Sequence, residues 1–244
     1  MGNSVLLVTG ASSDVGSALI KRVAANYDHI VCHYRGSFEM IERLQSQLGK
    51  KIIPARADFA SEGETAEFIR NVIEQEHAPS HFVHFASSGG SSRNVKFAKT
   101  DWKQFETEIH ITFRSAVMCC QAFAPLMAKA KRGKIVVMLS AQMVWEPAKP
   151  YSTAYTCVKH ALFALVKSLS VEYACKGVTV NGVSPSMIDT KFLLIPDIVK
   201  QTNIMHSPIK RLLTVDDVAP AFEFLLSPGA DAVTGQNIAV TAGN

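Results

Sequence analysis

The stretch Val5-Leu6-Leu7-Val8-Thr9-Gly10-Ala11-Ser12-Ser13-Asp14-Val15-Gly16 decides the fold of this chain. It opens with an apolar run that is typical of a buried β-strand. Two glycines follow, which allow a tight turn and close packing of the next segment. Behind them an amphipathic helix begins, with Lys21 and Arg22 on its polar face. A strand, a glycine turn and a helix in this order predict the first unit of a parallel α/β sheet.

The alternation of strand and helix continues along the rest of the chain. Further strands are expected at residues 30–34, 51–55, 81–85, 135–139, 178–183 and 237–240. Helices are expected at residues 18–25, 38–48, 64–75, 102–131, 154–175 and 216–226. Because the strands are almost continuously apolar, they predict a sheet that is buried on both faces. The expected fold is α/β, a single-domain Rossmann-like doubly wound parallel sheet of about seven strands with helices on both faces, over residues 1–244.

Composition limits the classes of protein that this chain can belong to. Its 244 residues are 48% hydrophobic and 19% charged, which excludes a disordered or fibrous chain. A net charge of +4 is too small for a nucleic-acid-binding tail. Five cysteines without a Cys-x-x-Cys pair predict free, buried thiols and no metal site. The apolar runs are shorter than a membrane span and no basic signal segment is present, so a cytoplasmic protein without a membrane partner is expected.

The loop between the first strand and the first helix is the candidate site for a dinucleotide. Ligands of such sheets bind at the carboxyl ends of the strands. The helix begins there, so its free N–H groups and its dipole can hold a pyrophosphate. The expected cofactor contacts in this loop are Gly10, Ser12, Ser13, Asp14 and Val15. The competing interpretation is that the two glycines serve only the turn and the packing.

Two residues after the next strands indicate which dinucleotide is bound. Arg35 follows the second strand, and an arginine at this place suits a 2′-phosphate by its charge and planar donors. This favours NADPH over NADH. Asp58 follows the third strand, where a carboxylate can accept a hydrogen bond from an adenine amino group. The alternatives are a solvated arginine and an acidic helix cap.

A tyrosine and a lysine lie one helical turn apart. Tyr155 and Lys159 are four positions apart and therefore share a face of the helix. A nearby ammonium lowers the pKa of a tyrosine from about 10, so that the phenol can exchange a proton with an alcohol or carbonyl oxygen. Ser140 ends the fifth strand and so faces the same crevice, where its hydroxyl can polarise a carbonyl. No Gly-x-Ser-x-Gly motif surrounds Ser140, which argues against a hydrolase.

Together these residues resemble the short-chain dehydrogenase/reductase family over nearly the whole chain. Residues 9–16 resemble its Thr-Gly-x-x-x-Gly-x-Gly loop, and Ser140, Tyr155 and Lys159 match its catalytic triad in order. Residues 181–190 are similar to its Pro-Gly segment, which contacts the nicotinamide carboxamide. Within the family the chain looks most similar to the β-ketoacyl-(acyl carrier protein) reductases.

The resemblance implies a role for each matching residue. Tyr155 is the implied proton donor to the substrate carbonyl, and Lys159 also binds the nicotinamide ribose. Thr112 takes the place of a helix asparagine that belongs to the proton relay. The remaining implied cofactor contacts are Phe59, Ala86, Ser87, Pro185, Ser186, Ile188 and Thr190.

The chain departs from the family pattern at several places. Asp14 stands where the second loop glycine is usual, so its carboxylate must point away from a pyrophosphate, for example as a helix cap. The usual Asn-Asn-Ala-Gly after the fourth strand reads His84-Phe85-Ala86-Ser87. Thr112 replaces an asparagine, and Pro-Gly has become Pro185-Ser186. None of these changes removes a catalytic side chain.

Residues 191–207 lie where the family has a substrate lid. The apolar members of this segment are Phe192, Leu193, Leu194, Ile195, Pro196, Ile198, Ile204 and Met205. They favour an apolar or acyl substrate, or else a helix that packs on the core. A basic cluster before the fifth strand could steer an acidic acyl carrier protein, or form a solvated helix end. This cluster contains Lys129, Lys131, Arg132 and Lys134.

Three functions remain open from the sequence. The first hypothesis is an NADPH-dependent reductase of 3-oxoacyl thioesters, as used in fatty acid biosynthesis, with Tyr155 as proton donor. The second is an NADP-dependent dehydrogenase of a small alcohol, sugar or ketone. The third is a non-catalytic or regulatory subunit that keeps the fold. The wide apolar surface of the helix at residues 154–175 suits both core packing and a subunit interface, and the family resemblance implies a homodimer or homotetramer.

Overall fold

A parallel sheet of seven strands forms the centre of the molecule. The computed structural model describes residues 4–75, 77–89, 95–144, 150–191, 193 and 195–243. The strands lie in the order β3-β2-β1-β4-β5-β6-β7. All six neighbouring pairs are parallel. The chain reverses its direction of winding between β1 and β4, so a crevice opens there at the carboxyl ends of the strands. The predicted fold is confirmed.

The strands lie where the apolar runs predicted them. Their bounds are Val5–Thr9 (β1), His29–Tyr34 (β2), Ile52–Arg56 (β3), His81–His84 (β4), Gly133–Met138 (β5), Val178–Pro185 (β6) and Asn237–Val240 (β7). All five residues of β1 and all four of β4 are buried. These strands occupy the middle of the sheet and are covered on both faces, which explains their apolar sequences.

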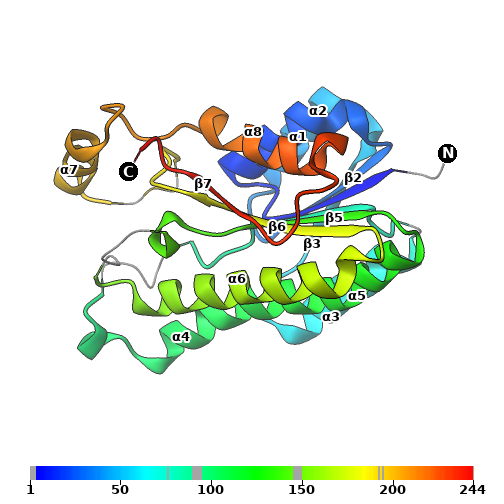
Figure 1. Cartoon of the computed structure of the whole chain (residues 1–244), viewed down its shortest axis with the longest axis horizontal. Coiled ribbons are helices and arrows are strands. Elements are labelled where there is room, and N and C mark those ends of the chain that lie inside the picture. The colour runs from blue at the N-terminus through cyan, green and yellow to red at the C-terminus, as the bar shows by residue number, and fades with distance from the viewer. Residues whose placement is uncertain are drawn as a thin grey trace.

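Two helical layers cover the sheet. One face carries α1 (Asp14–Val23), α2 (Phe38–Leu48) and α8 (Val215–Leu226), and the other carries α3 (Glu62–Glu74), α5 (Ser115–Lys129) and α6 (Thr153–Ala174) (Figure 1). Each layer encloses its own apolar core against the sheet. The helix α7 (Asp197–His206) follows β6 and projects from one end of the molecule (Figure 1). Short 3₁₀-helices lie at Ala24–Asn26, Gly49–Lys51, Phe97–Lys99, Ala141–Met143 and Pro228–Ala230.

The long helix expected at residues 102–131 contains a π-helical segment. It consists of α4 (Trp102–Glu108), the π-helix η4 (Ile109–Arg114) and α5. Its span Trp102–Lys129 is long and apolar enough to cross a membrane by length and composition alone. However, 50% of its most apolar window is buried inside the structure, as in a core helix. A π-helix shifts the phase of the side chains, and such segments are frequent at functional sites.

The cysteines divide into two groups. Cys32, Cys119 and Cys120 are buried in the core, as expected. Cys157 and Cys175 are exposed, so the prediction that all five thiols are buried is wrong for these two. Both lie on α6 or at its end, on the side that faces away from the sheet. All five are free thiols.

Candidate active site

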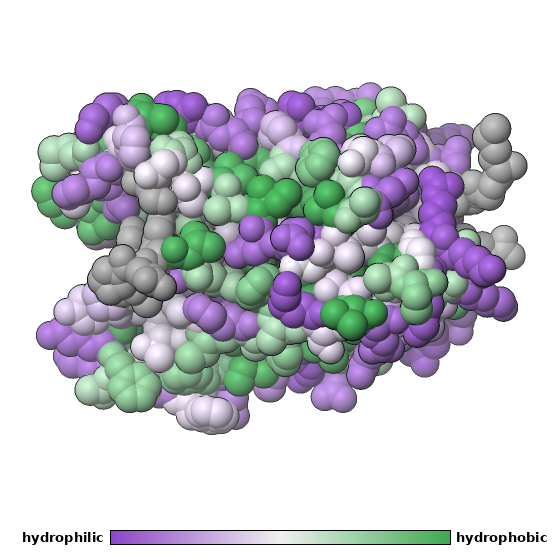
Figure 2. All heavy atoms as spheres, viewed as in Figure 1, coloured by the Kyte–Doolittle hydropathy of each residue, from purple (hydrophilic) through white to green (hydrophobic). Residues whose placement is uncertain are grey.

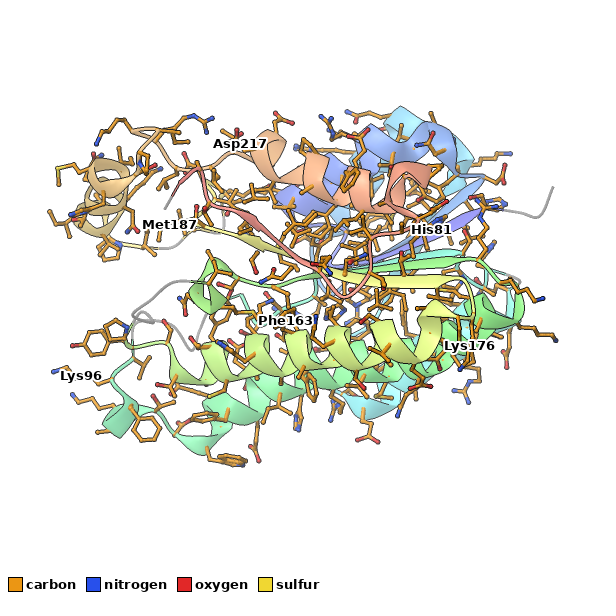
Figure 3. All side chains as sticks on the ribbon, in the orientation of Figure 1. His81, Lys96, Phe163, Lys176, Met187 and Asp217 are labelled. Carbon is orange, nitrogen blue, oxygen red and sulfur yellow. The ribbon has the colours of Figure 1, made fainter. Side chains whose placement is uncertain are left out.

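A cleft of about 340 Å³ opens at the carboxyl ends of the strands. Met187, which lines it, lies toward the end of the molecule from which α7 projects, whereas His81 at the start of β4 lies toward the opposite end (Figure 3). Ten of the predicted site residues line this cleft: Ser13, Asp14, Val15, Ser87, Ser140, Tyr155, Pro185, Ser186, Ile188 and Thr190. Segments far apart in the sequence therefore meet at one place.

The catalytic candidates lie on the wall between β5 and α6. Tyr155, in the first turn of α6, and Ser140, just after β5, both line the cleft and are each 7% exposed. Lys159 is buried one turn further along α6, with its Nζ atom 5.6 Å from the centroid of the Tyr155 ring. Its ammonium donates a hydrogen bond of 2.7 Å to the carbonyl oxygen of Met138. This bond fixes the positive charge beside the tyrosine.

Thr112 occupies a different position from the other catalytic candidates. It lies in η4, is fully buried, and is not among the residues that line the cleft. Its hydroxyl donates a hydrogen bond of 3.3 Å to the Glu108 carboxylate, which also accepts one of 2.5 Å from Ser88. The Thr112 side chain is thus directed to a buried glutamate that the sequence analysis did not select.

The predicted cofactor loop, residues 10–16, combines glycines that packing requires with free N–H groups. Gly10 has φ +69°, and a Cβ atom there would lie 3.0 Å from the amide nitrogen of Ala86. A Cβ on Gly16 would lie 2.7 Å from the Gly10 carbonyl oxygen. Both glycines are therefore required by packing alone, so they do not by themselves identify a nucleotide site.

The main-chain N–H groups of this loop are better evidence for a ligand than its glycines. Ser13 caps α1 by accepting a hydrogen bond from the Gly16 amide at 3.1 Å. Within the described part of the chain, the main-chain N–H groups of Ser12, Asp14 and Val15 have no hydrogen-bond acceptor. They lie at the start of a helix, where the dipole is positive and free N–H groups can bind an anion.

Two buried histidines hold this loop from opposite sides. On the β2 side, His33 accepts a hydrogen bond from the Gly10 amide at 3.0 Å through Nδ1, while its Nε2 lies 3.1 Å from the Ala57 carbonyl oxygen. On the β4 side, Nδ1 of His84 lies 2.8 Å from the Thr9 hydroxyl and Nε2 lies 3.0 Å from the Thr112 carbonyl oxygen. Since a carbonyl can only accept, both rings carry their proton on Nε2.

Burial keeps these histidines neutral. Burial, together with a smaller contribution from the nearby Lys159 ammonium, lowers the pKa of His84 to about 3. It also lowers the pKa of His33 to about 4, against smaller opposing effects of the Ala57 carbonyl and Asp58. The Gly10 amide can only donate, so its bond to Nδ1 depends on a neutral His33, whereas the Thr9 hydroxyl could also accept a bond from a protonated His84.

Asp14 does not cap its helix, because Ser13 does. Its carboxylate instead contacts the start of the predicted lid. One oxygen accepts a hydrogen bond of 3.0 Å from the Lys191 amide, and the other lies 3.5 Å from the Lys191 ammonium. The alternative of a capping Asp14 is thus wrong, and its partner is 177 positions away in the sequence.

The residues predicted for the adenosine half follow β2 and β3. Arg35 is exposed and forms no ion pair with any residue that the structure describes. Asp58 accepts a hydrogen bond of 2.9 Å from the Ala60 amide, so its carboxylate partly closes its own turn. The Phe59 ring is buried and stacks on His33 with centroids 3.9 Å apart, which leaves only its main chain for a nucleotide. Ala86 is buried beside Gly10.

Four residues of the site were not selected from the sequence. His84 had a visible signal, since it replaces an asparagine of the family pattern. His33, Glu108 and Lys191 had none, because their roles arise from contacts between distant segments. Of the predicted lid, the structure describes Leu193, Ile195, Val199 and Asn203 on the cleft wall. Phe192 and Leu194 lie outside the described residues.

Comparison with known proteins shows which family this chain resembles. A family described as enoyl-(acyl carrier protein) reductase matches residues 10–244. The 2-(R)-hydroxypropyl-CoM dehydrogenase of Xanthobacter autotrophicus is 32% identical, over 95% of this chain and 94% of that protein. The 3-oxoacyl-[acyl-carrier-protein] reductase FabG of Staphylococcus epidermidis is 26% identical over 99% of this chain and 98% of its own.

Solved structures share the fold. ElxO with NADP bound superposes with a TM-score of 0.87 at 24% identity, covering 99% of this chain and 98% of that one. A short-chain type dehydrogenase/reductase from Mycobacterium ulcerans gives 0.86 at 24% identity, covering 98% of this chain and 89% of that one.

The class that this fold and cleft define is a dinucleotide-dependent α/β oxidoreductase. The chain belongs to the short-chain dehydrogenase/reductase family. As a member it is an NAD(P)-dependent oxidoreductase that acts on CH–OH groups.

The buried histidines make folding sensitive to acid. Burial lowers the pKa of His33 and His81 to about 4 and that of His84 to about 3, whereas an unfolded histidine titrates near 6.5. The unfolded chain therefore binds protons first, and stability should fall as the pH drops from about 6.5 toward 4. Each titrating histidine adds a slope of up to about 1.4 kcal/mol per pH unit. Urea unfolding between pH 7.5 and 4.5 measures this slope.

The control is His84→Asn, which can keep one acceptor and one donor but does not titrate. We expect a flatter dependence of unfolding free energy on pH in this variant. An unchanged slope would show that His84 is not protonated on unfolding in this range.

Proposed function

We propose that this chain is an NADPH-dependent carbonyl reductase that converts a 3-oxoacyl thioester to the 3-hydroxyacyl form. The observation that carries the proposal is the joint placement of Ser140, Tyr155 and the anion-binding loop on one cleft, with Lys159 fixed beside the tyrosine. When bound, the nicotinamide supplies a hydride to the substrate carbonyl carbon.

The side chains on the cleft wall complete the reduction by handling the oxygen. The hydroxyls of Ser140 and Tyr155 donate hydrogen bonds to the carbonyl oxygen and stabilise the charge that develops on it. The Tyr155 hydroxyl then transfers its proton to that oxygen, which leaves a phenolate. The Lys159 ammonium, 5.6 Å from the ring, stabilises this phenolate until a proton from solvent restores it. The product is the alcohol.

The preference for NADPH rests on Arg35. Its guanidinium is exposed, lies at the end of β2 and is not neutralised by a carboxylate among the described residues. A 2′-phosphate would supply the missing negative charge and accept two parallel hydrogen bonds from it. The NADP bound to the structural neighbour ElxO supports this choice.

The choice of a thioester substrate rests on the apolar side of the cleft. Leu193, Ile195 and Val199 of the lid segment line the cleft, and Phe85 and Met187 contribute further apolar surface to it. This apolar lining suits an acyl chain. The similarity to the FabG enzymes supports a thioester as the substrate. The second candidate, a dehydrogenase of a small alcohol, is favoured by the higher identity to the hydroxypropyl-CoM dehydrogenase. A non-catalytic subunit is disfavoured because Ser140 and Tyr155 line the cleft and Lys159 lies beside the tyrosine ring.

An acyl carrier protein is the candidate carrier, but the basic cluster does not adjoin the cleft of its own chain. Lys131 and Lys134 lie at the start of β5, whereas Ser140 follows the end of this strand. Six strand residues, about 20 Å, separate the two ends. Lys134 is also paired with Asp231 at 2.6 Å. A carrier seated at the cleft would not touch this cluster, so the relatives alone support the carrier.

The assembly that we propose is a cytoplasmic homodimer or homotetramer of one-domain subunits, residues 1–244, each with a lid near residues 191–207. β7 is the edge of the sheet and is only half-buried. Hydrophobic side chains gather around it and α8 in the space-filling view (Figure 2). Val171 on α6 and Trp102 on α4 are 80% and 66% exposed. An uncovered edge strand and such side chains are well suited to a contact with a second copy.

Tyr155→Phe should abolish most turnover and leave nucleotide binding intact. The variant loses only the proton donor, which contributes about 10²–10⁴-fold to such reactions. Steady-state turnover and a fluorescence titration with NADPH measure the two effects separately. Near-normal turnover would refute the assignment of Tyr155.

Arg35→Ala should weaken NADPH binding about 10–100-fold and change NADH binding little. The expected factor corresponds to the loss of charge-assisted hydrogen bonds to the 2′-phosphate. Titration of both nucleotides checks it. Arg43→Ala is a matched control, since Arg43 is exposed on the neighbouring α2 and paired with Glu39 at 2.5 Å. Equal weakening of the two nucleotides would contradict the role of Arg35.

The substrate class is tested by comparing turnover of acetoacetyl thioesters with that of a panel of free ketones and alcohols. We expect the thioesters to give the higher kcat/KM. Activity on free alcohols without turnover of any thioester would favour the second candidate function.

A further inference from the structure

The cofactor loop contains a charge that is unfavourable for its proposed ligand. Asp14 is the first residue of α1, beside the N–H groups that are free to bind a pyrophosphate. Its side chain is only 20% exposed, so solvent screens its carboxylate incompletely. A carboxylate this close to an anion would repel it. The loop therefore needs a cation near Asp14 if it is to bind a dinucleotide.

Lys191 supplies that cation from the segment after β6. Its amide and its ammonium contact different oxygens of the Asp14 carboxylate, at 3.0 and 3.5 Å. Asp14 lines the cleft, so the Lys191 ammonium lies 3.5 Å from a residue of the cleft wall. The Lys191 side chain is 55% exposed and extends from the first turn of the lid segment toward the loop.

We propose that Lys191 is a cofactor-binding residue that neutralises Asp14, so that the loop presents no net negative charge to the pyrophosphate. This inference rests on the proposed nucleotide-dependent function. The same pair connects the lid segment to the cofactor loop, so the position of the lid and the affinity for the nucleotide are linked. Lys191 acts on the pyrophosphate, which NADPH and NADH share, whereas Arg35 acts on the 2′-phosphate alone.

A purely structural ion pair would behave differently. If the pair only held the lid in place, removing either partner would be equally harmful and removing both would be no worse. Under the proposal the two single changes have opposite signs. Removing the lysine leaves an uncompensated carboxylate, while removing the carboxylate leaves an additional cation for the pyrophosphate.

The test is a double-mutant cycle in which fluorescence titration measures the dissociation constants of NADPH and NADH. We expect Lys191→Met to weaken both nucleotides about tenfold and by the same factor. Asp14→Asn, which keeps an acceptor for the Lys191 amide, should tighten both a few-fold. The double variant Asp14→Asn/Lys191→Met should return to near the wild-type affinity.

Lys200→Met is the matched control. Lys200 is a lysine of the same lid segment, paired with Asp189 at 2.8 Å, and it does not line the cleft. Its removal should leave both dissociation constants unchanged. Thermal unfolding midpoints of all variants verify that each is folded.

Two results would overturn the inference: a Lys191→Met variant with wild-type affinity, or a double variant as weak as Lys191→Met. The inference and the proposed function fail differently. A wild-type protein that binds neither nucleotide would reject the proposed function. A wild-type protein that binds NADPH with no effect of Lys191 would reject this inference alone.

Discussion

The hydrogen bonds that position Thr9 and Gly10 at the end of β1 are the contacts on which the rest of the site depends. His33 holds the Gly10 amide from the β2 side, and His84 holds the Thr9 hydroxyl from the β4 side. These strands flank β1 at the point where the winding of the sheet reverses. The loop that begins there is therefore fixed in position by both halves of the fold.

This arrangement also links the cofactor loop to the catalytic wall. The ring of His84 reaches the carbonyl of Thr112 in the π-helix, and the Lys159 charge contributes to keeping that ring neutral. Lys159 in turn is anchored to the last residue of β5 and lies beside Tyr155. A buried neutral histidine thus connects the end of β1 with the elements that carry the proton donor.

The sequence was sufficient for the fold and for most of the cleft because both follow from local patterns. Apolar strands and amphipathic helices fix the parallel sheet, and in such a sheet Ser140, Pro185 and the glycine loop must meet at one edge. The π-helix at residues 109–114 was not predicted, because the apolar residues there indicated only one continuous helix over residues 102–131. Thr112 lies in this segment, and its hydroxyl contacts Glu108 and does not line the cleft.

Asp14 shows why contacts between distant segments were beyond the sequence. Read locally, a carboxylate at the start of a helix is favourable to the dipole and unfavourable to a pyrophosphate. Whether Asp14 weakens pyrophosphate binding depends on Lys191. The path of the chain after β6 brings Lys191 into contact with the Asp14 carboxylate. A local departure from the family pattern is therefore compensated by a residue on the lid. The affinity of the loop for its nucleotide belongs to the pair and not to either residue alone.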